Sequence, residues 1–93
     1  MQKIFKVKQG VLLAEKVNIL YALDIEPGRV HQFNETAKVI FQLCMEPTSL
    51  EDLIQEYILY FDVSESVAQE DVLSVVGAME KSNLLAESNI DEN

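Results

Sequence analysis

The stretch Val30-His31-Gln32-Phe33-Asn34-Glu35-Thr36-Ala37 joins a strand to a helix with no spare residue between them. Residues 30–33 alternate in character and include a β-branched and an aromatic side chain, which is typical of a strand. Asn34 follows directly and is a good N-cap, because its side-chain oxygen can accept a hydrogen bond from an orphan amide of the helix. Everything before this joint reads as strand and turn, and everything after it reads as helix.

Two further strands are predicted upstream of the joint, at residues 11–17 and 19–25. The second is followed by Glu26-Pro27-Gly28-Arg29, where Pro27 presets φ at the first central position of a type II turn and Gly28 supplies the positive φ at the second. Residues 30–33 then return antiparallel as a short third strand at an edge. Residues 1–9 are expected to be a lead-in, with Ile4 and Val7 not deeply buried.

Three helices are predicted downstream of the joint, from apolar residues at helical spacing. The first covers residues 35–45, with Cys44 buried on its core stripe, and ends before Pro47. The second is started by a capping box with Thr48 as the N-cap and Glu51 at N3, and it runs to Phe61. The third covers residues 65–83.

The ends of the third helix carry their own signals: Ser64 is its N-cap, and Asn83 closes it in the left-handed region. Residues 84–86 add a last apolar contact, and residues 87–93 are expected to be a disordered tail. The predicted fold is therefore α+β and winged helix-turn-helix-like, with a three-stranded antiparallel β-sheet followed by a three-helix bundle, in one domain over residues 10–86.

The bulk properties restrict where the protein works and what it binds. The chain has 93 residues, one cysteine and no apolar run long enough to span a bilayer, which favours a single cytoplasmic domain that does not bind membranes. Residues 1–33 hold five basic and three acidic side chains, whereas residues 34–93 hold two basic and thirteen acidic ones. Such a field repels nucleic acid and favours basic or neutral partners, unless the acidic residues serve solubility alone.

The residues that catalysis would need are scarce. One histidine and one cysteine leave no metal-ligand spacing, and the three glycines lie too far apart for a phosphate loop. A dyad of Cys44 and His31 is conceivable, but no third orienting group is evident. We therefore expect no enzyme, no metal site and no cofactor.

The predicted topology is one that commonly reads DNA through its recognition helix. Here, however, the third helix carries Lys81 as its single basic residue against four acidic ones, which are Glu65, Glu70, Asp71 and Glu80. A DNA-reading helix needs arginines and lysines to meet phosphates and base edges. The surface therefore argues against DNA even though the fold would allow it.

The spacing of several segments resembles the PqqD family, small proteins first known from pyrroloquinoline quinone (PQQ) synthesis. The resemblance covers residues 10–86 and rests on the joint at residues 30–37 with Ile40-Phe41, then on Thr48-Ser49-Leu50-Glu51-Asp52-Leu53, Tyr60-Phe61-Asp62-Val63, Asp71-Val72 and Leu84-Leu85. The chain departs from the family pattern at Met45-Glu46-Pro47, at Phe33 and at Gly77. The sum of the spacings carries the resemblance.

The resemblance implies a non-catalytic RiPP recognition element, an adaptor for ribosomally synthesised and modified peptides. Such a domain binds the leader of a precursor peptide by β-augmentation and presents it to a modifying enzyme, either a radical-SAM maturase or a leader peptidase. The groove lies between the third strand and the third helix, so the implied peptide-binding residues are Val30, His31, Gln32, Phe33, Val67, Glu70, Asp71, Ser74 and Ala78.

Several alternatives stay open at this point. Helical angles alone select the flank of Val67 over the opposite flank with Leu73, Gly77 and Glu80. The competing functions are a winged-helix DNA-binding regulator and a structural subunit of a larger enzyme complex. A homodimer is a further partner that the sequence leaves open, since a second copy could cover the third strand.

Overall fold

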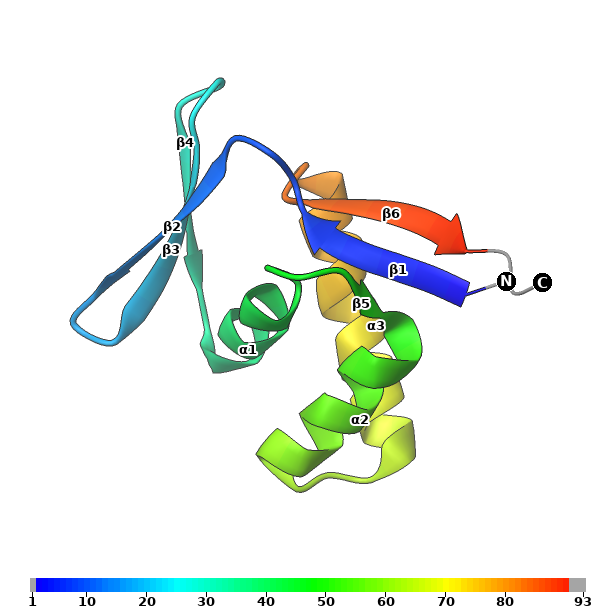
Figure 1. Cartoon of the computed structure of the whole chain (residues 1–93). Coiled ribbons are helices and arrows are strands. Elements are labelled where there is room, and N and C mark those ends of the chain that lie inside the picture. Colours follow the sequence, from blue (N-terminus) through cyan, green and yellow to red (C-terminus); the bar gives the residue numbers. More distant parts are fainter. Residues whose placement is uncertain (1, 91–93) are drawn as a thin grey trace.

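The computed structural model describes residues 2–90, which form two three-stranded antiparallel sheets and three helices (Figure 1). The elements are β1 (Gln2–Val7), β2 (Val11–Lys16), β3 (Ile19–Asp24), β4 (Arg29–Phe33), α1 (Glu35–Leu43), β5 (Thr48–Ser49), α2 (Leu50–Phe61), α3 (Glu65–Lys81) and β6 (Leu85–Ile90). The predicted α+β class, with a three-stranded sheet followed by three helices, is confirmed.

The first sheet has the order β2-β3-β4 and follows the chain. Gly28 takes φ +69° in the β3–β4 connection, as the turn chemistry required. Val17 and Asn18 form the two-residue β2–β3 turn, with φ 53° and 65°. This conformation is common for asparagine but costly for a β-branched valine, so the expected strand to residue 17 ends one residue earlier.

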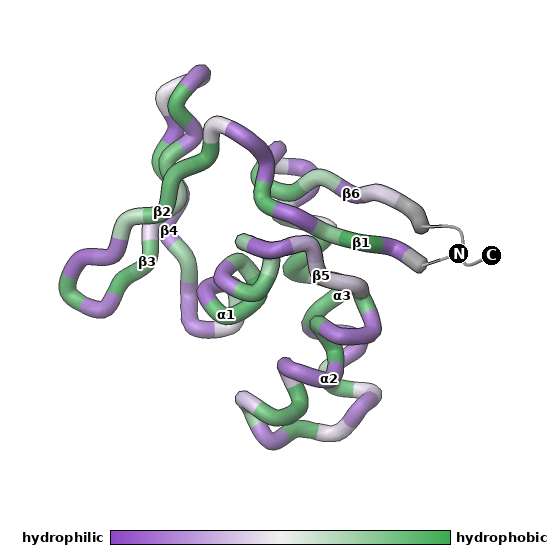
Figure 2. Tube along the Cα trace, in the orientation of Figure 1, coloured by the Kyte–Doolittle hydropathy of each residue, from purple (hydrophilic) through white to green (hydrophobic). Residues whose placement is uncertain are grey.

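The second sheet, with the order β5-β1-β6, was not predicted. The lead-in is in fact β1, in which Phe5 and Val7 are buried while Lys6 is exposed, and Figure 2 shows this alternation of hydrophobic and hydrophilic residues along β1. The expectation that Val7 lies near the surface is therefore wrong.

The sheet also corrects the expected tail. The disordered segment predicted from residue 87 is instead strand up to residue 90, because β6 pairs with β1 from Val7↔Leu85 to Gln2↔Ile90. Residues 91–93 of that segment lie outside the described residues.

The helix caps are local features, and most follow the sequence. The Asn34 side chain accepts a hydrogen bond from the Ala37 amide at 2.9 Å, and Ser64 caps α3. The cap of α2 differs from the prediction: Ser49, and not Thr48, accepts from the Asp52 amide at 3.0 Å. The Thr48 hydroxyl instead faces the carbonyls of Leu43 and Glu46, to which it can donate at 2.8 and 2.9 Å.

The ends of α1 and α3 lie slightly inside their predicted limits. Helix α1 ends at Leu43, two residues before the predicted Met45. Helix α3 ends at Lys81, and Asn83 then takes φ 60°, which confirms the left-handed closure. The Leu84 amide donates to the Met79 carbonyl at 2.9 Å across this closure. The closure therefore turns the chain directly from α3 towards β6.

Among the described residues, the buried hydrophobic side chains form one core that joins both sheets to the three helices. Its largest fully buried side chains include Leu20 of β3, Phe41 of α1, Leu53 of α2 and the residues Leu84 and Leu85. Cys44 is 0 % exposed, as predicted, and burial raises the pKa of its thiol to about 12, so the thiol is protonated at neutral pH. In the described part of the chain, no helix is long and apolar enough to cross a membrane.

Candidate functional site

Strand β4 has an open edge. It pairs with β3 alone among the described strands, and the N-terminal strand β1 pairs with β5 and β6 instead. The uncovered side of a strand presents unpaired N–H and C=O groups, which can pair with an incoming extended chain. The edge is therefore free for a fourth strand.

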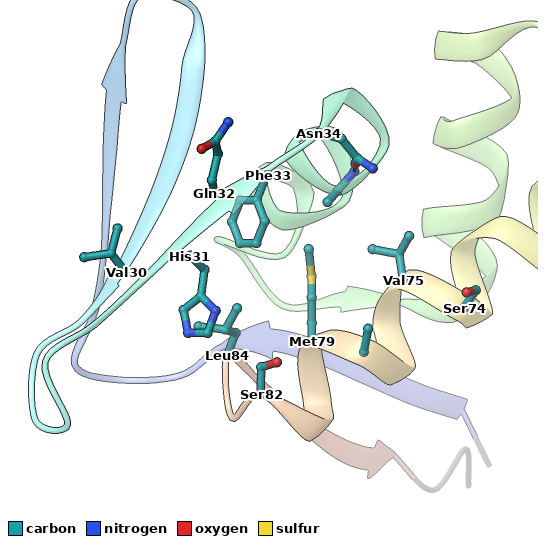
Figure 3. A pocket seen from close by; sticks show the side chains of 12 residues that line it. Val30, His31, Gln32, Phe33, Asn34, Ser74, Val75, Met79, Ser82 and Leu84 are labelled. Atoms are coloured by element: carbon teal, nitrogen blue, oxygen red, sulfur yellow. Dashed lines mark hydrogen bonds between the residues drawn. The ribbon is translucent and has the colours of Figure 1, made fainter.

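The register of β4 sorts its side chains between the two faces of the sheet. His31 lies opposite Ala22, and Phe33 lies opposite Leu20, both of which are buried. Val30 is 63 % exposed, and Figure 3 shows Val30 and Gln32 directed away from His31 and Phe33. Alternate residues of β4 thus face the helices, and the others face outwards.

A pocket of about 500 Å³ opens beside this edge, between β4, the start of α1 and the C-terminal half of α3 (Figure 3). The residues that line it are Val30, His31, Gln32, Phe33, Asn34, Ala37, Ser74, Val75, Ala78, Met79, Ser82 and Leu84. The pocket is therefore continuous with the free strand edge.

The lining of the pocket combines apolar side chains with uncharged polar ones. Phe33, Val75, Met79 and Leu84 supply large apolar surfaces, and the Phe33 ring packs on Phe41 with the ring centroids 4.9 Å apart. None of the lining residues is Asp, Glu, Lys or Arg. Such a pocket suits uncharged side chains of an extended segment, because burying a charge without a partner is costly.

Ser74 and Ala78 of α3, together with Ser82 just after its end, form the small-residue part of this pocket wall. They are spaced four residues apart and therefore follow one side of the helix. Their small side chains leave space between the helix and the strand. This wall explains why the pocket extends along α3.

The nine predicted site residues divide into two groups. Val30, His31, Gln32, Phe33, Ser74 and Ala78 line the pocket together. Val67, Glu70 and Asp71 lie outside it, further towards the N-terminus of α3. Contact with a peptide stays a prediction for all nine.

The residues outside the pocket have other surroundings. The Asp71 carboxylate accepts a hydrogen bond from the Tyr57 hydroxyl at 2.8 Å and so ties α3 to α2. Burial is the main cause that raises the pKa of Tyr57, and the bond to Asp71 adds to it. Val67 and Glu70 are exposed. Glu70 and Asp71, the acidic residues of the predicted flank, thus lie about one helical turn before Ser74, the first residue of α3 that lines the pocket.

Six lining residues were not predicted, which are Asn34, Ala37, Val75, Met79, Ser82 and Leu84. Val75 and Met79 have the spacing of the core stripe, so nothing in the periodicity separates them from ordinary core. Ser82 did carry a signal, because it continues the four-residue spacing of Ser74 and Ala78. That signal lay just past the last turn of the helix.

Comparisons with known proteins agree on the fold. A family model described as "Coenzyme PQQ synthesis protein D (PqqD)" matches residues 11–85. No curated protein matches the chain.

Two solved structures are similar to the chain. The structure described as "Lasso peptide synthetase B1 complexed with the leader peptide" is 22% identical with a TM-score of 0.77, over 88% of this chain and 96% of that one. "TbiB1 in Complex with the TbiA(beta) Leader Peptide" is 17% identical with a TM-score of 0.80, over 92% of this chain and 99% of that one. At these identities the likeness establishes the fold.

Proposed function

The chain belongs to the PqqD family, and from that premise we propose that it is a non-catalytic adaptor for a ribosomally synthesised precursor peptide. It binds the leader of that peptide as a fourth strand beside β4. It then presents the rest of the peptide to a modifying enzyme, such as a radical-SAM protein or a leader peptidase. The observation that carries the proposal is the open edge of β4 beside a pocket of about 500 Å³.

The physical basis is strand addition. Main-chain hydrogen bonds along β4 supply affinity that does not depend on sequence, and pockets for alternate side chains supply the choice. Every second residue of the added strand would face the pocket between His31, Phe33 and α3. The intervening residues would face outwards beside Val30 and Gln32 and stay accessible.

The names of the two solved neighbours support a leader peptide as the ligand. Both were solved with a leader peptide bound, and both cover nearly the whole of this chain. A leader held at an edge leaves the segment beyond it free, which is what a second enzyme needs in order to reach the site of modification.

A titration followed by NMR tests the proposal. The isotope-labelled domain is titrated with the leader of its precursor, and the amides of residues 30–33 and 74–82 are expected to shift together. Amides of α2, which lies outside the pocket, serve as the internal control. Binding without any change along β4 would contradict the proposal.

Backbone methylation of the peptide tests the strand pairing without altering the domain. A methyl group on a peptide nitrogen removes one ladder donor. Methylation is expected to abolish binding at every second position of the bound segment and to be tolerated at the others. Substitution of Val30 or Gln32 by proline should weaken binding in the same way, provided that the unfolding midpoint shows the variant to be folded.

Leader affinity also separates this function from that of a structural subunit. Both functions predict a stable complex with a modifying enzyme, so co-purification does not distinguish them. Only an adaptor is expected to bind the leader when the domain is isolated.

A further inference from the structure

His31 carries a polar atom whose hydrogen-bonding capacity is unused. Its Nε2 is buried, and no described residue offers it a hydrogen-bond partner. Of the buried side-chain nitrogen and oxygen atoms in the described residues, His31 Nε2 is the one without a hydrogen-bond partner. Leaving such an atom unpaired inside a protein is unfavourable, because its hydrogen bond to water is lost and not replaced, so the position calls for an explanation.

His31 forms part of the pocket lining. His31 lies on the inner face of β4, and its ring lines the pocket together with Leu84 and Ser82 (Figure 3). It is the one titratable side chain among the lining residues. Because Nε2 makes no hydrogen bond with the described residues, turning the ring into the pocket would break none.

We propose that His31 is a specificity-determining residue, and that it selects a peptide residue with a neutral hydrogen-bonding side chain, a hydroxyl or a carboxamide. This inference rests on the proposed function. The selected residue would be one of those on the added strand that face inwards. It would pair with His31 Nε2 while its neighbours on the same face meet Phe33, Val75 and Met79.

The charge of the pocket decides between neutral and charged partners. Apart from His31 itself, a carboxylate would find no cationic side chain among the lining residues, and an ammonium group would find no carboxylate. Burying either charge unpaired costs more than one hydrogen bond returns. An imidazole can donate or accept through Nε2 according to its tautomer, so both a hydroxyl and a carboxamide can pair with it.

A phage-displayed library of random peptides, selected on the immobilised domain, tests the inference without a known leader. Peptides that shift the amides of residues 30–33 are expected to share a hydroxyl or carboxamide side chain at one fixed position. Replacing that side chain by an apolar one of similar size should weaken binding about three- to tenfold, the value of one neutral hydrogen bond.

Variants of the domain then assign the effect to His31. In His31→Phe, the same change in the peptide should cost nothing, whereas His31→Asn should restore part of the preference. The matched control is Gln55→Ala, which alters an exposed polar residue of α2 outside the pocket and should keep the preference intact.

NMR of the imidazole gives a readout that a structural role would not move. The chain has a single histidine, so its ring nitrogens give unambiguous signals. The Nε2 shift should change with the selected peptide and return to its free value with the apolar analogue.

Two failures are distinguishable. Peptides that bind at β4 without any preference coupled to His31 would overturn this inference alone. A selection in which no peptide perturbs β4 would overturn the proposed function, and this inference with it.

Discussion

The two halves of α3 share one helix and one predicted flank, but they have different neighbours. In the N-terminal half, Asp71 is bonded to Tyr57 of α2, and Ala68 and Val72 are buried in the core. In the C-terminal half, Ser74 and Ala78 line the pocket beside β4. Helical periodicity gives the direction in which a side chain points, whereas the element that it meets changes from turn to turn.

The strongest test of this contrast is to fill the pocket from the C-terminal half. Ala78→Phe places a large ring on the exposed wall of the pocket, so peptide affinity should fall at least about tenfold while the fold is retained. Fluorescence anisotropy with a selected peptide measures it. The same change in the other half, Val67→Phe, should leave affinity unchanged, and equal losses in both variants would mean that the halves do not differ.

The second test removes the hydrogen bond between Tyr57 and Asp71 in the N-terminal half of α3. Asp71→Ala leaves the hydroxyl of buried Tyr57 without its acceptor and should lower the free energy of unfolding by about 1–2 kcal/mol. Peptide affinity of the folded variant should stay the same. Denaturant unfolding measures the loss, with Glu70→Ala as an exposed control, and Tyr57→Phe should make the Asp71 substitution nearly neutral.

Gly77 lies within the C-terminal half, between Ser74 and Ala78, and offers a test in which stability should rise. A Cβ atom built on Gly77 meets nothing within 4 Å, so close packing does not explain the glycine. Gly77→Ala should therefore raise the free energy of unfolding by about 1 kcal/mol through helix propensity alone. Peptide affinity should not change, because Gly77 does not line the pocket. A loss of stability would show that the backbone here requires glycine.

The smallest expected effect is a change in how stability depends on pH, and it concerns Glu80 in the C-terminal half of α3. Burial raises the pKa of Glu80 above its ordinary value of 4.5, the nearby Glu87 carboxyl raises it further, and Lys3 acts in the opposite direction. The native state therefore holds a proton that the unfolded state releases, so this contribution to stability is lost as the pH rises above 4.5.

Replacing Glu80 by glutamine checks this sign. Glu80→Gln should flatten the decline in stability above that pH and leave peptide affinity unchanged. Thermal unfolding across a pH series measures it. A variant whose stability falls with pH as steeply as that of the wild type would exclude Glu80 as the cause.

Features that depend on neighbouring residues were predictable from the sequence. The Asn34 cap, the positive φ of Gly28, the closure at Asn83 and burial of Cys44 all follow from short-range chemistry. The capping box predicted Thr48 as the N-cap of α2, but the Thr48 hydroxyl bonds the carbonyls of Leu43 and Glu46, and Ser49 accepts from the Asp52 amide instead. The capping pattern alone did not reveal these competing acceptors.

The sheet of β1 and β6 shows the same limit more clearly. Phe5 and Val7 alternate with Lys6 and Lys8, which is a strand signal, but the partner strand lies at the other end of the chain. The site was predictable to a similar degree. The residues of β4 followed from one joint, whereas the part of α3 that faces them depended on where the helix crosses the strand.

The turn at Val17-Asn18 has a consequence for the order in which the molecule assembles. A valine at φ 53° works against the turn that joins β2 to β3, so this hairpin gains little from its own loop and depends on the packing of Leu20 and Ala22. We expect the local contacts of α2 and α3 to form early and the hairpin late. Strand β4 pairs with β3 of that hairpin, so we expect the pocket beside β4 to be the last region to close during folding and among the first to open under stress.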